Sequence, residues 1–293
     1  MSRAGIVAVV GKPNAGKSTL LNRVIGEKLS ITSSKPQSTR DRIVGILTAD
    51  DAQMVMLDTP GLLEPRYPLH DAMRATAIAA LRDADVVIYL ADATQGAPVP
   101  LEEAARLDRP VTAPVLLALN KADALSADDV DALRARFADA FIISATRGDD
   151  VDALLAAVRA RLPESPYLYP DDEISTQTLR FFASELVRET ALEQLEEEVP
   201  YSIACEIEEF REDRAPVYIR AVLYIERESQ KHILIGAKGA KIRDIGRAAR
   251  EKIEALIGTK AYLDLWVKVL PNWRRDQRSL KRFGYLPPTE GHR

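Results

Sequence analysis

The strongest chemical signal in the sequence is a loop near its start, which reads Gly11-Lys12-Pro13-Asn14-Ala15-Gly16-Lys17-Ser18. An apolar run at residues 6–10 precedes the loop, and an amphipathic segment at residues 19–25 follows it. The spacing G-x-x-x-x-G-K-S between a strand and a helix predicts a phosphate-binding loop, in which glycines let backbone N–H groups point at an anion. The helix N-terminus adds a positive partial charge. We expect Lys17 to reach terminal phosphates and Ser18 to ligate the Mg²⁺ ion that accompanies them.

Two later segments carry the oxygen atoms and N–H groups that a magnesium–phosphate site needs. The polar, hydroxyl-rich stretch at residues 28–41 is typical of a loop that orders around a γ-phosphate and relaxes after hydrolysis, although a simple exposed loop has the same composition. Asp58-Thr59-Pro60-Gly61 follows an apolar strand pattern. There, Asp58 can hold Mg²⁺ through water and Gly61 can present its N–H group to the γ-phosphate, while a plain turn is the alternative.

Two further motifs indicate recognition of guanine. Asn120-Lys121-Ala122-Asp123 follows the fifth strand pattern, and the carboxylate of Asp123 can accept two donors from one edge of guanine. Adenine lacks that donor pair, so the site would reject it. We expect Lys121 and Asn120 to pack on the base plane and to brace the loop. Ser144-Ala145-Thr146, after the sixth strand pattern, can add a backbone N–H donor to the guanine oxygen. A site for ATP does not explain residues 120–123.

Residues 1–162 are expected to form one α/β domain that positions these motifs. Strands are predicted at residues 6–10, 43–47, 54–57, 86–91, 115–119 and 141–143, and helices at residues 18–25, 70–82, 102–107, 128–138 and 151–161. This alternation predicts a mixed, mostly parallel sheet with helices on both faces. Ligands of such sheets bind outside the carboxyl ends of the strands, which is where the four motifs fall.

A proline-rich segment at residues 163–172 reads as a stiff, extended linker to a second domain at residues 173–293. That domain is expected to be a smaller α+β unit, with helices at residues 175–198, 230–235 and 241–257, and strands at residues 201–210, 216–227 and 261–270. Gly236-Ala237-Lys238-Gly239 lies between two of the helices. G-x-x-G in that position is the signature of a KH domain, whose loop clamps a nucleic-acid backbone, whereas a helix-capping turn is the alternative.

Basic residues surround this loop, and we expect them to contact RNA together with residues 236–239: Lys231, Lys241, Arg243 and Arg247. The tail at residues 266–285 mixes basic and aromatic side chains. Its aromatic residues could stack on single-stranded bases, or Trp273, Leu280 and Phe283 could pack as one helix face onto the second domain.

The charge is distributed unevenly along the chain, although the net charge is only −4. Residues 163–213 hold 3 Lys/Arg against 15 Asp/Glu, and residues 214–293 hold 18 Lys/Arg against 8 Asp/Glu. The basic end indicates a polyanionic partner, with a solvated charged surface as the alternative.

The composition points to a cytoplasmic protein. The single cysteine, Cys205, allows no disulfide framework within the chain and suits a reducing compartment. No apolar run is long enough to span a bilayer, and we expect no signal peptide.

Together the first four motifs resemble those of translation-factor-class GTPases, and nearly the whole chain resembles the Era family of bacterial GTPases. The resemblance rests on G-K-P-N-A-G-K-S, P-Q-S-T-R-D-R-I-V-G-I, D-T-P-G and N-K-A-D, and later on E-R-E-S-Q-K-H-I-L-I-G-A-K-G-A-K-I and L-W-V-K-V. It implies binding of GTP and GDP, binding to the 3′ end of 16S ribosomal RNA, and a part in maturation of the small ribosomal subunit. It also implies some peripheral association with the inner membrane, and we expect a monomer.

The resemblance also assigns roles within the nucleotide site. Thr39 is expected to meet Mg²⁺ in the GTP state, together with Ser18 and Asp58, and Ser38 is the fallback for Thr39. The GTP site is expected to comprise Gly11, Lys12, Pro13, Asn14, Ala15, Gly16, Lys17, Ser18, Asp58, Thr59, Pro60, Gly61, Leu62, Asn120, Lys121, Ala122, Asp123, Ser144, Ala145 and Thr146. Of the residues at this site, Lys17, Thr39, Gly61 and Asn14 are expected to serve catalysis.

One departure from the Ras-like pattern affects the rate. Leu62 stands where a glutamine would orient the attacking water, and no arginine finger is apparent, so intrinsic turnover should be slow. GTPases with this loop and an apolar residue after D-T-P-G often use a potassium ion as a stationary positive charge, held partly by the loop asparagine, which is Asn14 here. The resemblance therefore implies hydrolysis that potassium stimulates.

Two functions remain open from the sequence. In the first, the protein is a GTP-switched assembly factor in which hydrolysis resets RNA binding. In the second, it is chiefly an RNA-binding module whose nucleotide stabilises the fold. The residues expected at Mg²⁺ and the γ-phosphate favour the first, because a purely structural nucleotide site would need neither Thr39 nor Gly61.

Overall fold

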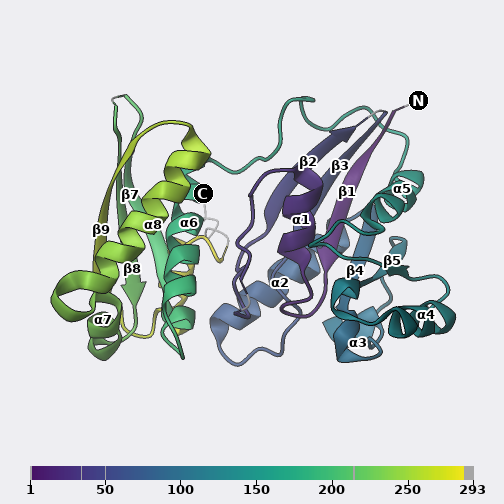
Figure 1. The fold of residues 1–293 in the computed structure, drawn as a ribbon, viewed down its shortest axis with the longest axis horizontal. Coiled ribbons are helices and arrows are strands. Elements are labelled where there is room, and N and C mark those ends of the chain that lie inside the picture. Colours follow the sequence, from purple (N-terminus) through teal and green to yellow (C-terminus); the bar gives the residue numbers. More distant parts are fainter. Residues whose placement is uncertain (1, 34, 50, 214, 287–293) are drawn as a thin grey trace, which may run out of the picture. The chain divides into compact units, whose positions relative to one another are not determined.

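The computed structural model describes residues 2–33, 35–49, 51–213 and 215–286 (Figure 1). The chain divides into two compact units, Met1–Pro65 with Met73–Thr176, and Arg66–Ala72 with Gln177–Arg293. Within the described residues no helix is long and apolar enough to cross a membrane.

The first unit is built on a six-stranded sheet in the order β2-β3-β1-β4-β5-β6, in which only β2 runs antiparallel to its neighbour. The strands are β1 Arg3–Val10, β2 Ile43–Ala49, β3 Ala52–Asp58, β4 Val86–Asp92, β5 Val115–Asn120 and β6 Phe141–Ile142. The helices are α1 Lys17–Ile25, α2 Pro68–Asp83, α3 Leu101–Ala105, α4 Ala127–Arg136 and α5 Val151–Arg161, and of α2 the part from Met73 onward belongs to this unit. The predicted α/β class is confirmed, and apolar strands buried on both faces explain it.

Strand register brings the sequence motifs to one edge of this sheet. Val9 pairs with Asp58 across β1 and β3, and Asp92 pairs with Asn120 across β4 and β5. Because these strands are parallel, the loops that follow them emerge side by side. The phosphate loop, Asp58 and Asn120 are far apart in the sequence and meet through this pairing.

The predicted linker does not run free of the first unit. Gln53, a fully buried side chain of β3, accepts the backbone N–H groups of Leu168 and Tyr169 at 2.8 and 2.9 Å. Its amide nitrogen donates to the carbonyl of Tyr169 at 2.9 Å. An unpaired buried amide is costly, so these bonds fix the extended segment against the sheet. Residues 163–172 therefore belong physically to the first unit, which continues to Thr176.

The second unit is an α+β layer in which helices cover one face of a three-stranded sheet, β7-β8-β9. β7 is antiparallel to β8, and β8 is parallel to β9. Its elements are α6 Leu179–Gln194, β7 Ala204–Arg211, β8 Val217–Ile225, α7 Glu228–Ile235, α8 Ala240–Ile257, β9 Ala261–Val269 and α9 Gln277–Arg282. Alternate residues of β8, such as Ile219, Ala221 and Leu223, face the helices and form the core.

Helix α6 is shorter than the predicted helix at residues 175–198. It begins after Thr178, whose hydroxyl caps the N–H of Phe181 at 3.2 Å, and Leu195 already has an extended backbone. Leu195 and Val199 are buried in the core, so packing ends the helix before the acidic run. Residues 200–202 likewise form a 3₁₀ turn and not the start of β7.

Trp273 and Phe283 of the tail pack inward, whereas Trp266 on β9 is exposed. Trp273 is fully buried, and its indole N–H donates to the carbonyl of Ser202 at 2.8 Å. Phe283 meets Trp273 edge to face at 5.3 Å, and Leu280 is buried as well. Base stacking by Trp273 is therefore ruled out in this arrangement, and the packing alternative holds for this cluster.

Candidate nucleotide and RNA sites

The phosphate loop owes its shape to glycines that no other residue could replace without collision. Gly16 has a backbone φ of +98°, and a Cβ atom there would lie 2.1 Å from the side-chain nitrogen of Asn120. A Cβ atom on Gly61 would lie 2.7 Å from the backbone nitrogen of Pro13. The D-T-P-G and N-K-A-D motifs thus both touch the phosphate loop closely.

Lys17 occupies a buried position at the centre of this loop. Its ammonium donates to the carbonyl oxygens of Gly11 and Lys12 at 3.2 and 3.0 Å. Burial lowers the pKa of Lys17 to about 8, although the nearby carboxylate of Asp58 opposes that shift. A buried ammonium that bonds to neutral carbonyls is well suited to bind an anion. Phosphate oxygens would provide the electrostatic stabilisation that the ammonium lost when it was removed from water.

Three oxygen-bearing side chains meet beside Lys17. The Ser18 hydroxyl donates to an Asp58 oxygen at 2.7 Å and lies 2.9 Å from the Thr39 hydroxyl, which is 3.5 Å from the same Asp58 oxygen. Burial raises the pKa of Asp58. Its second oxygen, Oδ1, is buried without a hydrogen-bond partner among the described residues. Hard oxygen donors and an unsatisfied carboxylate oxygen fit a divalent cation such as Mg²⁺.

The described residues contain no cluster of three or more His, Cys, Asp or Glu side chains that could hold a metal by themselves. A cation here would therefore depend on the hydroxyls, one carboxylate and the phosphate oxygens of a bound nucleotide. The structure places the Thr39 hydroxyl within reach of Ser18 and Asp58.

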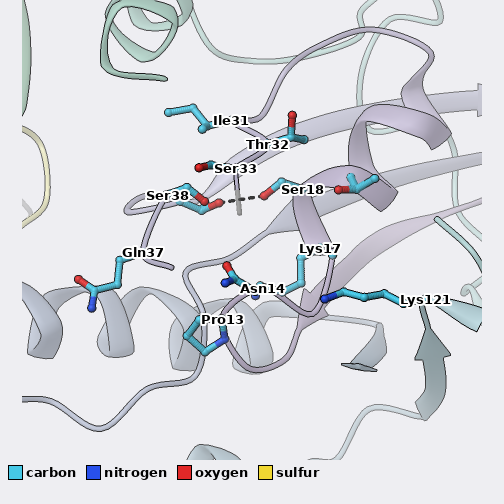
Figure 2. Close-up of a pocket in the computed structure, with 14 residues that line it drawn as sticks. Pro13, Asn14, Lys17, Ser18, Ile31, Thr32, Ser33, Gln37, Ser38 and Lys121 are labelled. Carbon is cyan, nitrogen blue, oxygen red and sulfur yellow. Dashed lines mark hydrogen bonds between the residues drawn. The ribbon is translucent and has the colours of Figure 1, made fainter. Parts of the chain in front are cut away.

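A pocket of about 430 Å³ opens over the phosphate loop. Figure 2 shows Asn14 and Lys17 on the loop, with Ile31 and Thr32 above them in this view. The expected GTP site did not include several residues that line the pocket: Thr19, Ile31, Thr32, Ser33 and Gln37. Most of these residues lie in the hydroxyl-rich stretch at residues 28–41, whose composition was the available signal.

The base-recognition motifs form one hydrogen-bonded unit. The Ser144 hydroxyl donates to Asp123 at 2.6 Å and so orients its carboxylate. The side chain of Asn120 donates to the carbonyl of Ala15 at 2.8 Å and accepts the N–H of Ala145 at 2.9 Å. Asn120 thus ties the base end of the site to the phosphate loop. The Ala145 N–H, one of the backbone donors of residues 144–146, is thus bonded to Asn120 in this structure.

Lys121 is held by a partner that the sequence motifs did not reveal. Its ammonium pairs with Asp92, at the end of β4, at 2.7 Å. Asp92 also accepts the N–H and hydroxyl of Thr94, and the bonds from Lys121 and Thr94 lower its pKa despite partial burial. A carboxylate at the end of a neighbouring parallel strand was the only sequence signal for this pair.

Two residues of the expected GTP site, Thr59 and Leu62, have buried side chains. Thr59 is fully buried, and its hydroxyl donates to the carbonyl of Val9 at 2.9 Å. Leu62 packs its side chain into the core of the first unit and donates its N–H to Gly11 at 2.9 Å. Both side chains are therefore engaged away from the pocket, because the turn after β3 folds them back onto β1.

In the second unit, the G-x-x-G loop joins α7 to α8. Gly236 and Gly239 have φ angles of +72° and +77°, and Lys238 between them also has a positive φ. A Cβ atom on Gly236 would lie 2.7 Å from the Cβ of Lys241. The loop therefore presents exposed backbone at the N-terminus of the 18-residue helix α8, a position that favours phosphate.

The basic side chains expected to contact RNA around this loop make different contacts in the structure. Lys238 is exposed, while Arg247 is exposed and pairs with Asp244 at 3.3 Å. Arg243 donates to the carbonyl of Lys238 at 3.0 Å and so braces the loop. Lys241 turns away, because its ammonium donates to the carbonyl of Gln194 at the end of α6 at 3.3 Å. In this arrangement Lys241 supports the fold where RNA contact was expected.

Comparison with known proteins now decides the family. Residues 6–121 match the model of the 50S ribosome-binding GTPase family, and residues 198–274 match that of the KH domain. GTPase Era of Pseudomonas aeruginosa is 45% identical over 97% of this chain and 95% of its own length. GTPase Era of Geobacter metallireducens is 43% identical over 97% of this chain and 98% of its own. This chain belongs to the Era family of GTPases.

Solved structures of the Era family share the fold across both units. Era in complex with MgGDPNP and nucleotides 1506–1542 of 16S ribosomal RNA superposes with a TM-score of 0.91 at 38% identity, covering 97% of this chain and 99% of that one. A variant of Aquifex aeolicus Era bound to GDP and AlF4⁻ gives a TM-score of 0.90, with the same coverage and identity.

The lowered pKa of Lys17 predicts a pH dependence of nucleotide binding by this Era-family protein. As the pH rises through about 8, Lys17 in the empty site loses its proton, and Lys17 must then take up a proton when the nucleotide binds. We expect the affinity for GDP to fall about threefold between pH 7.5 and 8.5, measured by calorimetry in two buffers of different ionisation enthalpy. Lys17→Gln should bind more weakly and show no proton uptake, and equal uptake by this variant would contradict the assignment.

Proposed function

We propose that this chain is a GTP-switched RNA-binding protein that acts on the 3′ end of 16S ribosomal RNA during maturation of the small subunit. The observation that carries the proposal is the joint presence of two sites in one chain. Ser18, Thr39 and Asp58 converge where a cation and a γ-phosphate would lie, and a G-x-x-G loop stands at the start of α8. The related Era structure holds MgGDPNP and the 16S fragment, which supports the same ligands here.

Within this proposal each nucleotide-site residue has a defined task. In hydrolysis, water attacks the γ-phosphorus, and the bond to the bridging β–γ oxygen breaks to give GDP and phosphate. Lys17 would neutralise the charge that develops on the phosphates, and Gly61, which lines the pocket, would donate its N–H to the γ-phosphate. Bound Mg²⁺ would neutralise β- and γ-oxygens, with Ser18 and Thr39 as its hydroxyl ligands and Asp58 beside them.

The switch follows from the position of Thr39. Its hydroxyl lies in the cluster with Ser18 and Asp58, where it would contact Mg²⁺. Release of the γ-phosphate would remove the contacts that hold residues 28–41 in their GTP-state conformation. Residues 120–123 and 144–146 would select guanine through Asp123. We further propose a monomer that works in the cytoplasm, with peripheral contact at the inner membrane.

We propose that a potassium ion supplies the positive charge that an arginine finger provides in other GTPases. Leu62 is buried in the core and offers no side chain to orient water, which predicts slow turnover. Asn14 has a φ of +61° and lines the pocket beside Lys17, where its amide oxygen could ligate a monovalent cation. Such an ion would supply stationary positive charge near the phosphates.

The switch is tested by RNA affinity in two nucleotide states. Binding of an RNA equivalent to nucleotides 1506–1542 is measured with Mg²⁺ and either GDPNP or GDP, at one fixed salt concentration. We expect binding at least tenfold tighter with GDPNP, because an effector acts only through its differential affinity for two states. Lys238→Glu should weaken RNA binding in both states and leave nucleotide affinity unchanged.

Equal and tight RNA binding in both states would refute the switch and support the alternative, an RNA-binding module with a structural nucleotide. Absence of RNA binding in both states, with nucleotide bound, would refute the RNA target.

Potassium dependence is tested by single-turnover GTP hydrolysis in potassium and in sodium chloride at equal ionic strength. We expect faster hydrolysis in potassium, and loss of the difference in Asn14→Ala, because the amide ligand is removed. Equal wild-type rates in the two salts would reject the proposed ion.

A further inference from the structure

We propose that Arg23 is a positioning residue that holds the base-recognition loop at a fixed place relative to the phosphate loop, and so sharpens selection of guanine. The inference rests on the proposed guanine site, but none of the sequence motifs includes Arg23. The residue lies in the last turn of α1, the helix that begins at Lys17.

The contacts of Arg23 form a two-pronged clamp. Its Nε donates to the carbonyl of Ala145 at 2.5 Å, and one terminal nitrogen donates to the carbonyl of Thr146. A guanidinium is planar and presents donors in a fixed fork, so two neighbouring carbonyls held by one group lose their freedom to rotate. Lysine carries all its donors on one nitrogen at the end of a flexible stem, so it cannot reproduce the fixed planar spacing of the fork.

The loop needs this support because the sheet holds it weakly. β6 has two residues, Phe141 and Ile142, and beyond them only Ile143 exchanges backbone hydrogen bonds with Leu119 and Ala122 among the described residues. Beyond it, the loop closes on itself, with the Ser144 N–H donating to the carbonyl of Asp149 and the Gly148 N–H to that of Ser144. Asn120 and Asp123 hold this turn from the β5 side, and Arg23 adds an anchor from α1.

Gly148 leaves room for the guanidinium of Arg23 beside the loop. Gly148 has a φ of +94°, and a Cβ atom there would approach a terminal nitrogen of Arg23 to 3.0 Å. The loop backbone and the arginine are therefore in close contact on the side that faces α1.

Arg23 and Asn120 hold the same loop through different atoms. Asn120 accepts the Ala145 N–H and ties it to Ala15 of the phosphate loop, while Arg23 binds the carbonyls of Ala145 and Thr146 from α1. Because Ser144 orients Asp123 from this loop, a displacement of the loop would misplace the carboxylate that reads guanine.

The test compares base selection with phosphate binding in Arg23→Met, which keeps the aliphatic stem and removes the donors. Affinities are measured for GDP, for IDP, which lacks the 2-amino group, and for pyrophosphate. We expect GDP binding to weaken about tenfold, the GDP-to-IDP preference to shrink by a similar factor, and pyrophosphate binding to stay within about twofold. Arg23→Lys should recover part of the preference.

Two controls separate the possible failures. Arg82→Met removes an exposed arginine of α2 and should change none of these affinities. Asp123→Asn should abolish the GDP-to-IDP preference, and a wild-type protein that lacks this preference would refute the guanine site itself. An unchanged preference in Arg23→Met, or an equal loss of GDP and pyrophosphate binding, would overturn the positioning role.

Discussion

The nucleotide site depends on two charges that the fold removes from water, the ammonium of Lys17 and the carboxylate of Asp58. Burial lowers the pKa of the first to about 8 and raises the pKa of the second, so each is less stable as an ion than it would be in solvent. Their mutual attraction offsets only part of that cost. Phosphate oxygens and a divalent cation would supply the remaining stabilisation, which gives a physical reason for a site that favours both together.

The rest of the first unit can be understood as the means of holding these charges. Parallel pairing of β1 with β3 places Asp58 beside the phosphate loop, and glycines allow the backbones to approach to contact. Asn120 then spans from β5 to Ala15, so the base end and the phosphate end share one rigid frame. A displacement of any of these loops would change the distance between the residues that recognise the base and the loop that binds the phosphates.

Sequence patterns predicted what depends on local spacing. The phosphate loop, Asp58 and residues 120–123 were identifiable because each motif follows an apolar strand, and register then places them together. The patterns could not reveal contacts between distant segments, such as Gln53 with Tyr169 or Asp92 with Lys121. Gln53 is a polar residue followed by the apolar run at residues 54–57, and its hydrogen bonds to residues 168 and 169 explain that position.

Sequence patterns also could not show that some residues in or beside a motif point their side chains away from the expected site. Leu62 and Thr59 lie in or next to the D-T-P-G motif, but the side chain of Leu62 packs in the core and that of Thr59 bonds to Val9. Lys241 lies beside the G-x-x-G loop, but its ammonium bonds to the carbonyl of Gln194 at the end of α6. The length of α6 was overestimated because the acidic run at residues 196–198 continues a helical composition, whereas burial of Leu195 and Val199 ends the helix.

The most direct measurement is a crystal structure of this protein with Mg²⁺ and GDPNP. If the cluster beside Lys17 is the cation site, the hydroxyl oxygens of Ser18 and Thr39 will both lie at about 2.1 Å from the metal, with Asp58 in contact through water. A metal that binds away from Thr39, with residues 28–41 arranged as they are with GDP, would contradict the switch on which the proposed function rests.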